Sequence, residues 1–427
     1  MVDRALFLAV LALRPAVVAA VYRPGSAGAG YVSATWRLPS WTPTYAMAAS
    51  TVFMPCNYSG FHNVSEAAAY GWVQYDWSDD KDEWVQGKPM DAEAVASQQA
   101  AKVRAVADAS TVVGLYQSGP KALPWFPEVR AKLDDPQYER WFLKFRNTSK
   151  TNVPVCTGDL CSDLYHDQTQ VPQHDYDNGD DYDNGVCVDA CDCGTTKPCG
   201  NYVWDFRNES FQAWYVETLF LARLEATPGA RAFYIDDRIY GSGDDAYVSE
   251  MSTYFMDDVA LEADERVALR IGFETTMEAL YDALVARGAF AWQMLDDGPH
   301  SEAAKTPDIC AAILRKDYCA DGGGLPATRA TLETHAIDDW ADADKAESYT
   351  AQFLLYRGPY AWLGYDWNGC RVDHYPYPPQ WSEDFGAPVA TCSEVADGVF
   401  QRNWTKATVT WDCHAARGTI DRGGGSA

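Results

Sequence analysis

Acidic side chains follow several short, β-rich runs of this 427-residue sequence. Asp76, Asp205, Asp236, Asp237 and Asp366 end such runs, and Glu333 lies within one. Two carboxyl groups placed across a glycosidic bond can hydrolyse it, one as acid and the other as nucleophile or base. Their separation is about 5–5.5 Å for retention and about 6.5–9.5 Å for inversion. The chemistry open to these residues is therefore glycoside hydrolysis, if the fold brings two of them together.

The preferred catalytic pair is Asp205 with Asp236, because these residues end neighbouring predicted strands. In this pair Asp205 is the expected nucleophile or base, and Asp236 or Asp237 the expected acid. Side chains alternate along a strand, so that if Tyr234 faces the axis of a barrel then Asp236 does too, and Asp237 lies at the rim. A bulge would exchange the roles of Asp236 and Asp237. Glu333 is the rival nucleophile, because it lies in the seventh predicted strand, where barrel glycosidases frequently carry a catalytic glutamate.

Further side chains beside the strand ends could bind a sugar. The chain has 16 Trp and 25 Tyr, and a flat aromatic ring matches the apolar C–H face of a pyranose. The candidates for substrate contact are Asp76, Trp77, Trp204, Arg207, Tyr234, Trp292, Gln293 and Trp367. The structural alternatives are core packing for the aromatic rings, and ion pairs of the aspartates with Arg207 or Arg238.

Eight short apolar runs have the composition of strands. They are 51–54, 70–77, 112–117, 201–206, 232–237, 289–295, 329–336 and 359–366. Amphipathic, helix-like stretches lie between them at 91–108, 136–145, 210–226, 262–287 and 342–356. Alternating strands and helices predict a parallel sheet with right-handed crossovers. Eight such units predict a (β/α)₈ TIM-type barrel of the α/β class, whose active site lies at the C-terminal ends of the strands.

Two segments depart from this repeat. Residues 151–200 carry six cysteines and are predicted to be a Cys-rich insertion between units 3 and 4, stapled over the barrel mouth. Residues 368–413 are predicted to be a disulfide-bonded C-terminal extension, within a single barrel domain that spans 21–427. The acidic run from Asp175 to Asp183 could bind calcium, but it does not match the EF-hand loop. We therefore expect a solvated loop, no metal and no cofactor.

The chain carries the marks of secretion. Residues 1–20 read as a signal peptide. Twelve cysteines, an even number, favour disulfides in an oxidising compartment, among them a local bridge between Cys310 and Cys319. Glycosylation sequons begin at Asn57, Asn63, Asn147, Asn208 and Asn403. No later segment approaches the roughly 20 apolar residues of a membrane span.

Charge and motifs exclude several functions. A net charge of −27 would repel phosphate backbones, which excludes nucleic acid as a partner. The sequence lacks the GxSxG of serine hydrolases and the HExxH of metalloproteases. A glycosidase acting on extracellular or cell-wall carbohydrate remains the leading hypothesis. A non-catalytic glycan-binding or cell-surface barrel is the alternative, and the sugar, the linkage and the oligomeric state are open.

Several motifs resemble those of secreted, uncharacterised glycoside-hydrolase-like barrel proteins of eukaryotic microbes, over roughly residues 50–413. They are Tyr75–Ser78, Lys121–Phe126, Cys161–Gln168, Trp204–Asn208, Phe233–Asp237, Phe290–Leu295, Arg357–Gly364, Asp384–Pro388, Gly398–Trp404 and Ala407–Trp411. The resemblance implies a barrel fold. It also implies acidic mouth residues at Asp205, followed by Asn208, and at Asp236. The usual lead-in to the fifth strand is replaced here by Gly229–Phe233, which leaves the register of the acidic pair open.

Overall fold

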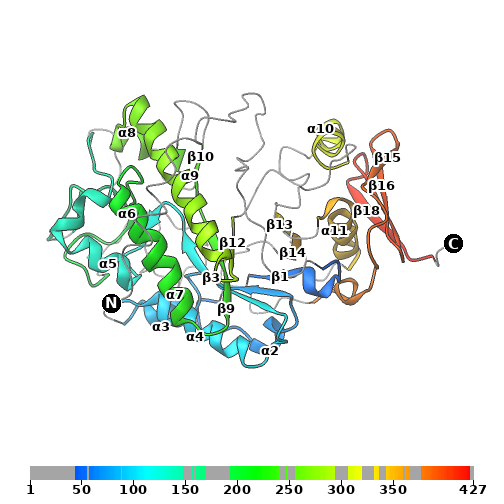
Figure 1. Ribbon diagram of the computed structural model, residues 1–427, viewed down its shortest axis with the longest axis horizontal. Helices are drawn as coiled ribbons and strands as arrows, with labels where there is room; N and C mark the ends of the chain where they lie inside the picture. Colours follow the sequence, from blue (N-terminus) through cyan, green and yellow to red (C-terminus); the bar gives the residue numbers. More distant parts are fainter. Residues whose placement is uncertain are drawn as a thin grey trace. The chain divides into compact units, whose positions relative to one another are not determined.

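The computed structural model describes residues 44–54, 57–87, 89–147, 155–157, 159–168, 193–240, 247–248, 255–293, 306–319, 331–335, 343–358, 361–365 and 377–423 (Figure 1). The predicted signal peptide, the Asp175–Asp183 loop, Asp366 and Trp367 lie outside the described residues. Within the described residues, no helix has both the length and the apolar character needed to cross a membrane.

Seven parallel strands form the central sheet. They are β1 (Thr51–Phe53), β2 (Trp72–Gln74), β3 (Val112–Ser118), β9 (Ala230–Asp236), β12 (Phe290–Gln293), β13 (Thr331–His335) and β14 (Ala361–Tyr365), in the order β12-β9-β3-β2-β1-β14-β13. The first strand therefore bonds to both the second and the last, as in a barrel. This order confirms a TIM-like parallel arrangement for seven of the eight predicted strands.

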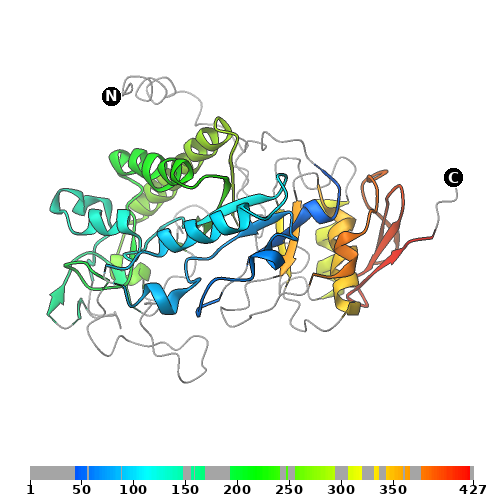
Figure 2. The ribbon, with the colours of Figure 1, turned by 90° about the horizontal axis from the view of Figure 1, so that it is seen from below.

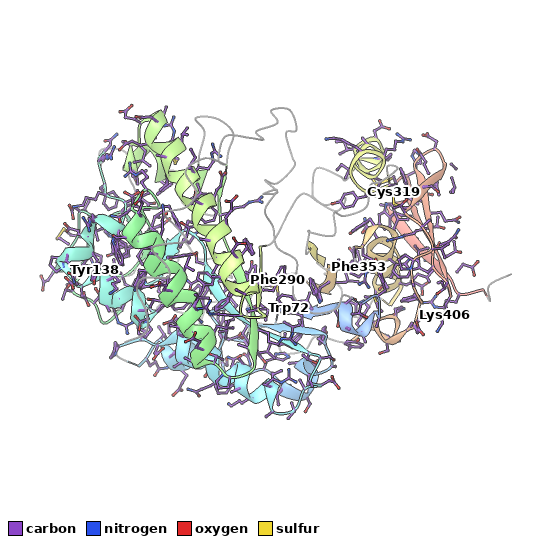
Figure 3. The ribbon with its side chains drawn as sticks, viewed as in Figure 1. Trp72, Tyr138, Phe290, Cys319, Phe353 and Lys406 are labelled. Carbon is purple, nitrogen blue, oxygen red and sulfur yellow. A yellow bond between two sulfur atoms is a disulfide. The ribbon has the colours of Figure 1, made fainter. Side chains whose placement is uncertain are left out.

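The sheet curls around a packed interior. Trp72 of β2 contacts Trp362 of β14 at a ring-centroid distance of 4.8 Å and Phe290 of β12 at 6.1 Å, and Figure 3 shows Trp72 beside Phe290. Strands β2 and β12 are separated in the sheet by two other strands, so Trp72 and Phe290 can meet only if the sheet is curved. Gly114 of β3 leaves room in this interior, because a Cβ there would lie 2.0 Å from Oε1 of Gln74.

Helices cover the outer face of the sheet. Four of the five predicted helical stretches are helices: α4 (Ala92–Arg104), a continuous run of α6 (Glu209–Trp214), η4 (Tyr215–Ala222) and α7 (Arg223–Ala226), then α9 (Ala263–Val285) and α11 (Ala343–Tyr356). The fifth is a 3₁₀ turn, η2 (Pro136–Trp141). Shorter helices are η1 (Ala48–Ser50), α2 (Val64–Ala67), α3 (Lys81–Trp84), α5 (Pro127–Leu133), α8 (Phe255–Val259), α10 (Pro307–Ile313), η6 (Leu314–Tyr318) and η7 (Pro379–Ser382). Arg223 links two layers, since it pairs with Glu93 of α4 and donates to the carbonyl of Tyr116 in β3.

The predicted fourth barrel strand, 201–206, lies in a different sheet, so this prediction was wrong. Strand β8 (Asn201–Val203) pairs antiparallel with β4 (Lys121–Ala122) and with β7 (His166–Asp167). A short apolar run predicts a strand but not its partner, and here antiparallel pairing satisfies the backbone equally well. The fourth parallel strand along the chain is therefore β9. Two small hairpins lie outside both sheets: β5 (Cys156–Thr157) with β6 (Leu160–Cys161), and β10 (Ile239–Tyr240) with β11 (Tyr247–Val248).

The C-terminal extension is an antiparallel sheet of β15 (Ser393–Ala396), β16 (Val399–Asn403), β17 (Thr408–Asp412) and β18 (Arg417–Asp421). It lies beside α11 in both ribbon views (Figures 1 and 2), where Gly418 donates its N–H to Ser348. The sheet thus runs beyond the predicted boundary at residue 413.

Four disulfides are formed among the described residues. Two join α10 and η6 to the C-terminal sheet: Cys310–Cys413 and Cys319–Cys392. The predicted bridge between Cys310 and Cys319 was therefore wrong, because each of these cysteines faces a partner distant in sequence. The other two are local, Cys156–Cys161 and Cys193–Cys199, and they lie in the predicted insertion.

Gly272 in α9 gives a prediction about packing. Alanine normally stabilises a helix interior by about 1 kcal/mol over glycine. At residue 272, however, a Cβ would lie 2.0 Å from the carbonyl oxygen of Phe206. We expect Gly272→Ala to lower the free energy of unfolding by about 1–3 kcal/mol, measured by denaturant unfolding. Ala268→Gly, at an exposed position of the same helix, is the control for helix propensity alone. A stabilised Gly272→Ala variant would contradict the close approach.

Candidate active site

The Asp236 carboxylate, at the C-terminal end of β9, is held by three donors. The Tyr116 hydroxyl donates to Oδ2 at 2.8 Å, the Tyr234 hydroxyl to Oδ1 at 2.9 Å, and the Asp237 N–H to Oδ1 at 3.0 Å. Hydrogen bonds to an ionised acceptor are roughly twice as strong as neutral ones. The donors therefore orient both oxygens of the carboxylate.

Strand register explains why these side chains meet. Tyr116 of β3 lies directly opposite Tyr234 of β9. Phe233, the neighbour of Tyr234, packs outward on Phe220 of η4 at a centroid distance of 4.7 Å. Because side chains alternate along a strand, Tyr234 and Asp236 point to the opposite, inner face, as the sequence pattern predicts.

Asp76 supplies a second carboxyl group just beyond β2. Its Oδ1 accepts hydrogen bonds from the N–H of Ser78, at 2.9 Å, and from the Ser78 hydroxyl. The pKa of Asp76 is raised from 3.8 to about 6, mainly by burial and to a smaller extent by the negative charge of Asp236. The bonds from Ser78 and the cation of Lys81 oppose this rise in pKa. Asp76 can therefore hold a proton near pH 6, which suits a general acid.

The hydroxyl of Tyr116 lies among these acids. Burial raises the pKa of Tyr116 well above 10, and the charges of Asp236, Asp237 and Asp76 raise it further. Tyr116 therefore remains a neutral donor at any physiological pH. All three aspartates thus lie close enough to act electrostatically on one phenol, and they lie at or just beyond the C-terminal ends of β2 and β9, on either side of β3 in the sheet.

Asp237 has a different environment from Asp236. Its Oδ1 lies 2.9 Å from Nζ of Lys121, and the two side chains are only 1% and 5% exposed. Its Oδ2 accepts a hydrogen bond from the Ser118 hydroxyl at 3.0 Å. Asp237 thus forms a buried ion pair beside the site.

Asp205 is not at the end of a parallel strand. It follows β8, in the separate antiparallel sheet, so the predicted placement of Asp205 and Asp236 on neighbouring barrel strands was wrong. Nε and Nη2 of Arg207 donate to its two oxygens, each at 2.7 Å. Nη1 of Arg207 reaches Glu265 of α9 at 2.7 Å, and Glu265 also pairs with Arg146. The ion pair between Asp205 and Arg207 that the sequence offered as an alternative is present, and Arg207 joins it to Glu265.

These contacts predict a modest effect for Asp205→Asn. The variant keeps the shape of the side chain but removes the charge that Arg207 contacts. We expect a loss of stability of about 1 kcal/mol, since the network is partly exposed, and a change in turnover of no more than about threefold. Thermal unfolding and steady-state kinetics measure the two effects. A loss of turnover of a hundredfold or more at unchanged stability would return Asp205 to the catalytic pair.

The structure assigns the predicted sugar-contacting side chains to different environments. Trp204 is fully buried, stacked between Phe142 and Phe211 with both centroid distances 4.7 Å, so its faces meet protein. Trp77 is half-buried and packs on Trp125 at 4.7 Å. Trp292 and Gln293 lie in β12 opposite Tyr234 and Ile235, and Glu333 lies in β13 opposite Leu363.

Several residues of the site were missed by the sequence analysis. Tyr116 lies in the predicted strand 112–117 and Ser118 directly follows it, so their alternation with outward residues was a usable signal. Lys121 and Ser78 follow strand ends and carried no comparable pattern. Lys81 lies in α3 over the rings of Tyr58 and Trp77, and burial lowers its pKa from 10.5 to about 8.

No family model and no curated protein matches this sequence. Solved structures with partial similarity include an alpha-galactosidase from Lactobacillus brevis, at 9% identity and a TM-score of 0.40, covering 84% of this chain and 45% of that one. A GH36 alpha-galactosidase from Geobacillus stearothermophilus has 9% identity and a TM-score of 0.41, covering 86% and 47%. The Nostoc punctiforme debranching enzyme has 9% identity and a TM-score of 0.43, covering 88% of each chain. This chain spans less than half the length of the two alpha-galactosidases, and similarities this low assign no residue and no reaction.

Proposed function

We propose that this protein is a glycoside hydrolase in which Asp236 and Asp76 are the paired carboxyl groups. One observation supports this most directly: a carboxylate fixed by three donors shares a site with a carboxyl group whose pKa is raised to about 6. Two acids whose environments differ in this way can divide the roles of base and acid at one pH.

In the proposed reaction Asp76 donates its proton to the glycosidic oxygen as the bond to the anomeric carbon breaks. Asp236 either attacks that carbon to form a glycosyl ester or removes a proton from the water that attacks it. In the first case Asp76, now ionised, takes a proton from the water that cleaves the ester. Tyr116 and Tyr234 hold the Asp236 oxygens throughout.

The finer features of the fold and setting belong to the same proposal. The seven-stranded parallel sheet would close into a barrel between β12 and β13, with Trp292 and Gln293 near the substrate and Glu333 as a further acid to test. Four disulfides among the described residues favour an oxidising compartment. The sequon residues Asn63 and Asn403 are exposed. Together with the predicted signal peptide, these features support a secreted glycoprotein that acts on extracellular carbohydrate.

A glycan panel tests the proposal. The purified protein is incubated with aryl glycosides and polysaccharides from pH 4 to 8, and released reducing ends are measured. Proton NMR of the first-formed anomer then distinguishes retention from inversion. We expect turnover of at least one member and its loss in Asp236→Asn. Binding without turnover would favour the glycan-binding alternative. A protein that neither binds nor cleaves any member of the panel would contradict both roles.

A further inference from the structure

We infer that Asp237 is a positioning residue, and that its ion pair with Lys121 braces the carboxylate of Asp236. The inference deepens the proposed function and rests on it. Asp237 was among the predicted catalytic residues because it directly follows Asp236 at the end of β9. Its buried contacts give it a different task.

The first part of the brace joins two strand ends. Lys121 and Ser118, on either side of the turn that follows β3, both bind the carboxylate of Asp237 after β9. The N–H of Lys121 also donates to the Ser118 hydroxyl at 3.2 Å. The N–H of Gly119 donates to the carbonyl oxygen of Asp236 at 2.6 Å. The two turns are thus tied together by side chains and by backbone.

The second part of the brace is the backbone of Asp237 itself. Its φ is +58°, a left-handed conformation that costs a non-glycine residue about 1 kcal/mol or more. This conformation accompanies the 3.0 Å bond from its N–H to Oδ1 of Asp236. The ion pair with Lys121 can hold the strained turn in place, and through it one of the three donors to Asp236. Gly119 must stay small beside it, since a Cβ would lie 2.8 Å from the Asp237 carbonyl oxygen.

The ion pair also balances charge at the site. The titratable groups at this site include Asp76, Tyr116, Lys121, Tyr234 and Asp237, and Lys81 acts on Asp76. Lys121 and Asp237 cancel each other as long as both are present. Loss of Lys121 leaves an extra negative charge beside Asp236, and loss of the Asp237 charge leaves an extra positive one. The two changes must therefore move the titration of Asp236 in opposite directions.

The experiment follows the titration of Asp236 directly, with no substrate. The protein is labelled with carbon-13 at Cγ of aspartate, Asp236 is assigned by Asp236→Asn, and its NMR shift is followed with pH. Lys121→Met should move the midpoint upward, and Asp237→Asn should move it downward. The double variant should return it close to the wild-type value. Lys121→Arg keeps the positive charge, so its midpoint should equal that of the wild type. This variant also tests the inference if Lys121→Met does not fold.

Kinetic measurements distinguish the positioning effect of the Lys121–Asp237 ion pair from its effect on charge. In the double variant the charges balance but the brace is gone. We therefore expect kcat to stay about 10- to 100-fold low, with KM within about twofold. Glu274→Gln, which breaks the Arg270–Glu274 pair of α9, is the control for a lost ion pair and should alter neither midpoint nor kcat. The inference is overturned if the midpoints of Lys121→Met and Asp237→Asn are equal or shift in the same direction from the wild type. Full turnover in the double variant would also overturn it. If the midpoints shift in opposite directions but the protein cleaves no glycoside, the charge balance is supported and the proposed function is contradicted.

Discussion

Asp236→Asn is expected to lower kcat/KM by roughly 10⁴-fold or more while the protein stays folded. Asparagine has nearly the shape of aspartate, and its one carbonyl oxygen can accept a hydrogen bond from one of the two tyrosine hydroxyls while its amide group donates to the other. It cannot, however, attack an anomeric carbon or remove a proton from water at a useful rate. Steady-state kinetics on the best substrate of the glycan panel, together with thermal unfolding, measure the two quantities.

Asp205→Asn is the matched control for Asp236→Asn, since it makes the same chemical change at an aspartate held by Arg207. A further variant, Asp236→Ala, opens space beside the anomeric carbon. If the mechanism is retaining, added azide should take the place of the nucleophile and give a glycosyl azide, identified by mass spectrometry. Turnover of Asp236→Asn within tenfold of the wild type would remove Asp236 from the reaction.

Asp76→Asn has the second largest expected effect, a loss of about 10²–10⁴-fold in kcat/KM on substrates whose leaving group needs a proton. In the wild type, Asp76 is protonated below its pKa of about 6. The rate should therefore fall as the pH rises through 6. The variant should lose this alkaline limb. Aryl glycosides with acidic phenols should lose far less activity, because their leaving groups depart without protonation.

The same substitution should stabilise the fold at neutral pH. The pKa of Asp76 is higher in the folded protein than its ordinary 3.8, so folding favours the protonated form. Ionisation of Asp76 does not destabilise the wild type below pH 3.8, and it destabilises the fold by the full amount above pH 6. The difference between the two pKa values corresponds to about 3 kcal/mol. Asp76→Asn should therefore be more stable than the wild type at pH 7 by up to that amount, and no more stable at pH 3.5. Equal stability at both pH values would contradict the raised pKa.

The run around Asp236 was well predicted from sequence because its signals are local. Tyr234 and Asp236 are two residues apart in a β-rich stretch, so alternation alone assigns them to one face. The run at 201–206 has the same composition, but its partners β4 and β7 are specified by contacts far away in the chain. Sequence periodicity carries no information on such partners.

Asp205 and the cysteines illustrate the same limit. The Asp-x-Arg spacing of Asp205 and Arg207 did suggest the ion pair that the structure contains, yet the spacing alone did not decide between pairing and catalysis. Cys310 and Cys319 are neighbours in sequence, but their partners lie 103 and 73 residues further on. The raised pKa of Asp76 arises from burial by several elements, which no local pattern records.

The position of β1 between β2 and β14 has a consequence for biogenesis. Thr51 pairs with Leu363, so a nascent chain that emerges from the ribosome must hold one side of β1 open until its final parallel strand has been synthesised. At typical elongation speeds this wait is tens of seconds. During that time the exposed edge of β1 is a template for wrong partners, which makes protection by chaperones a foreseeable requirement for producing this protein.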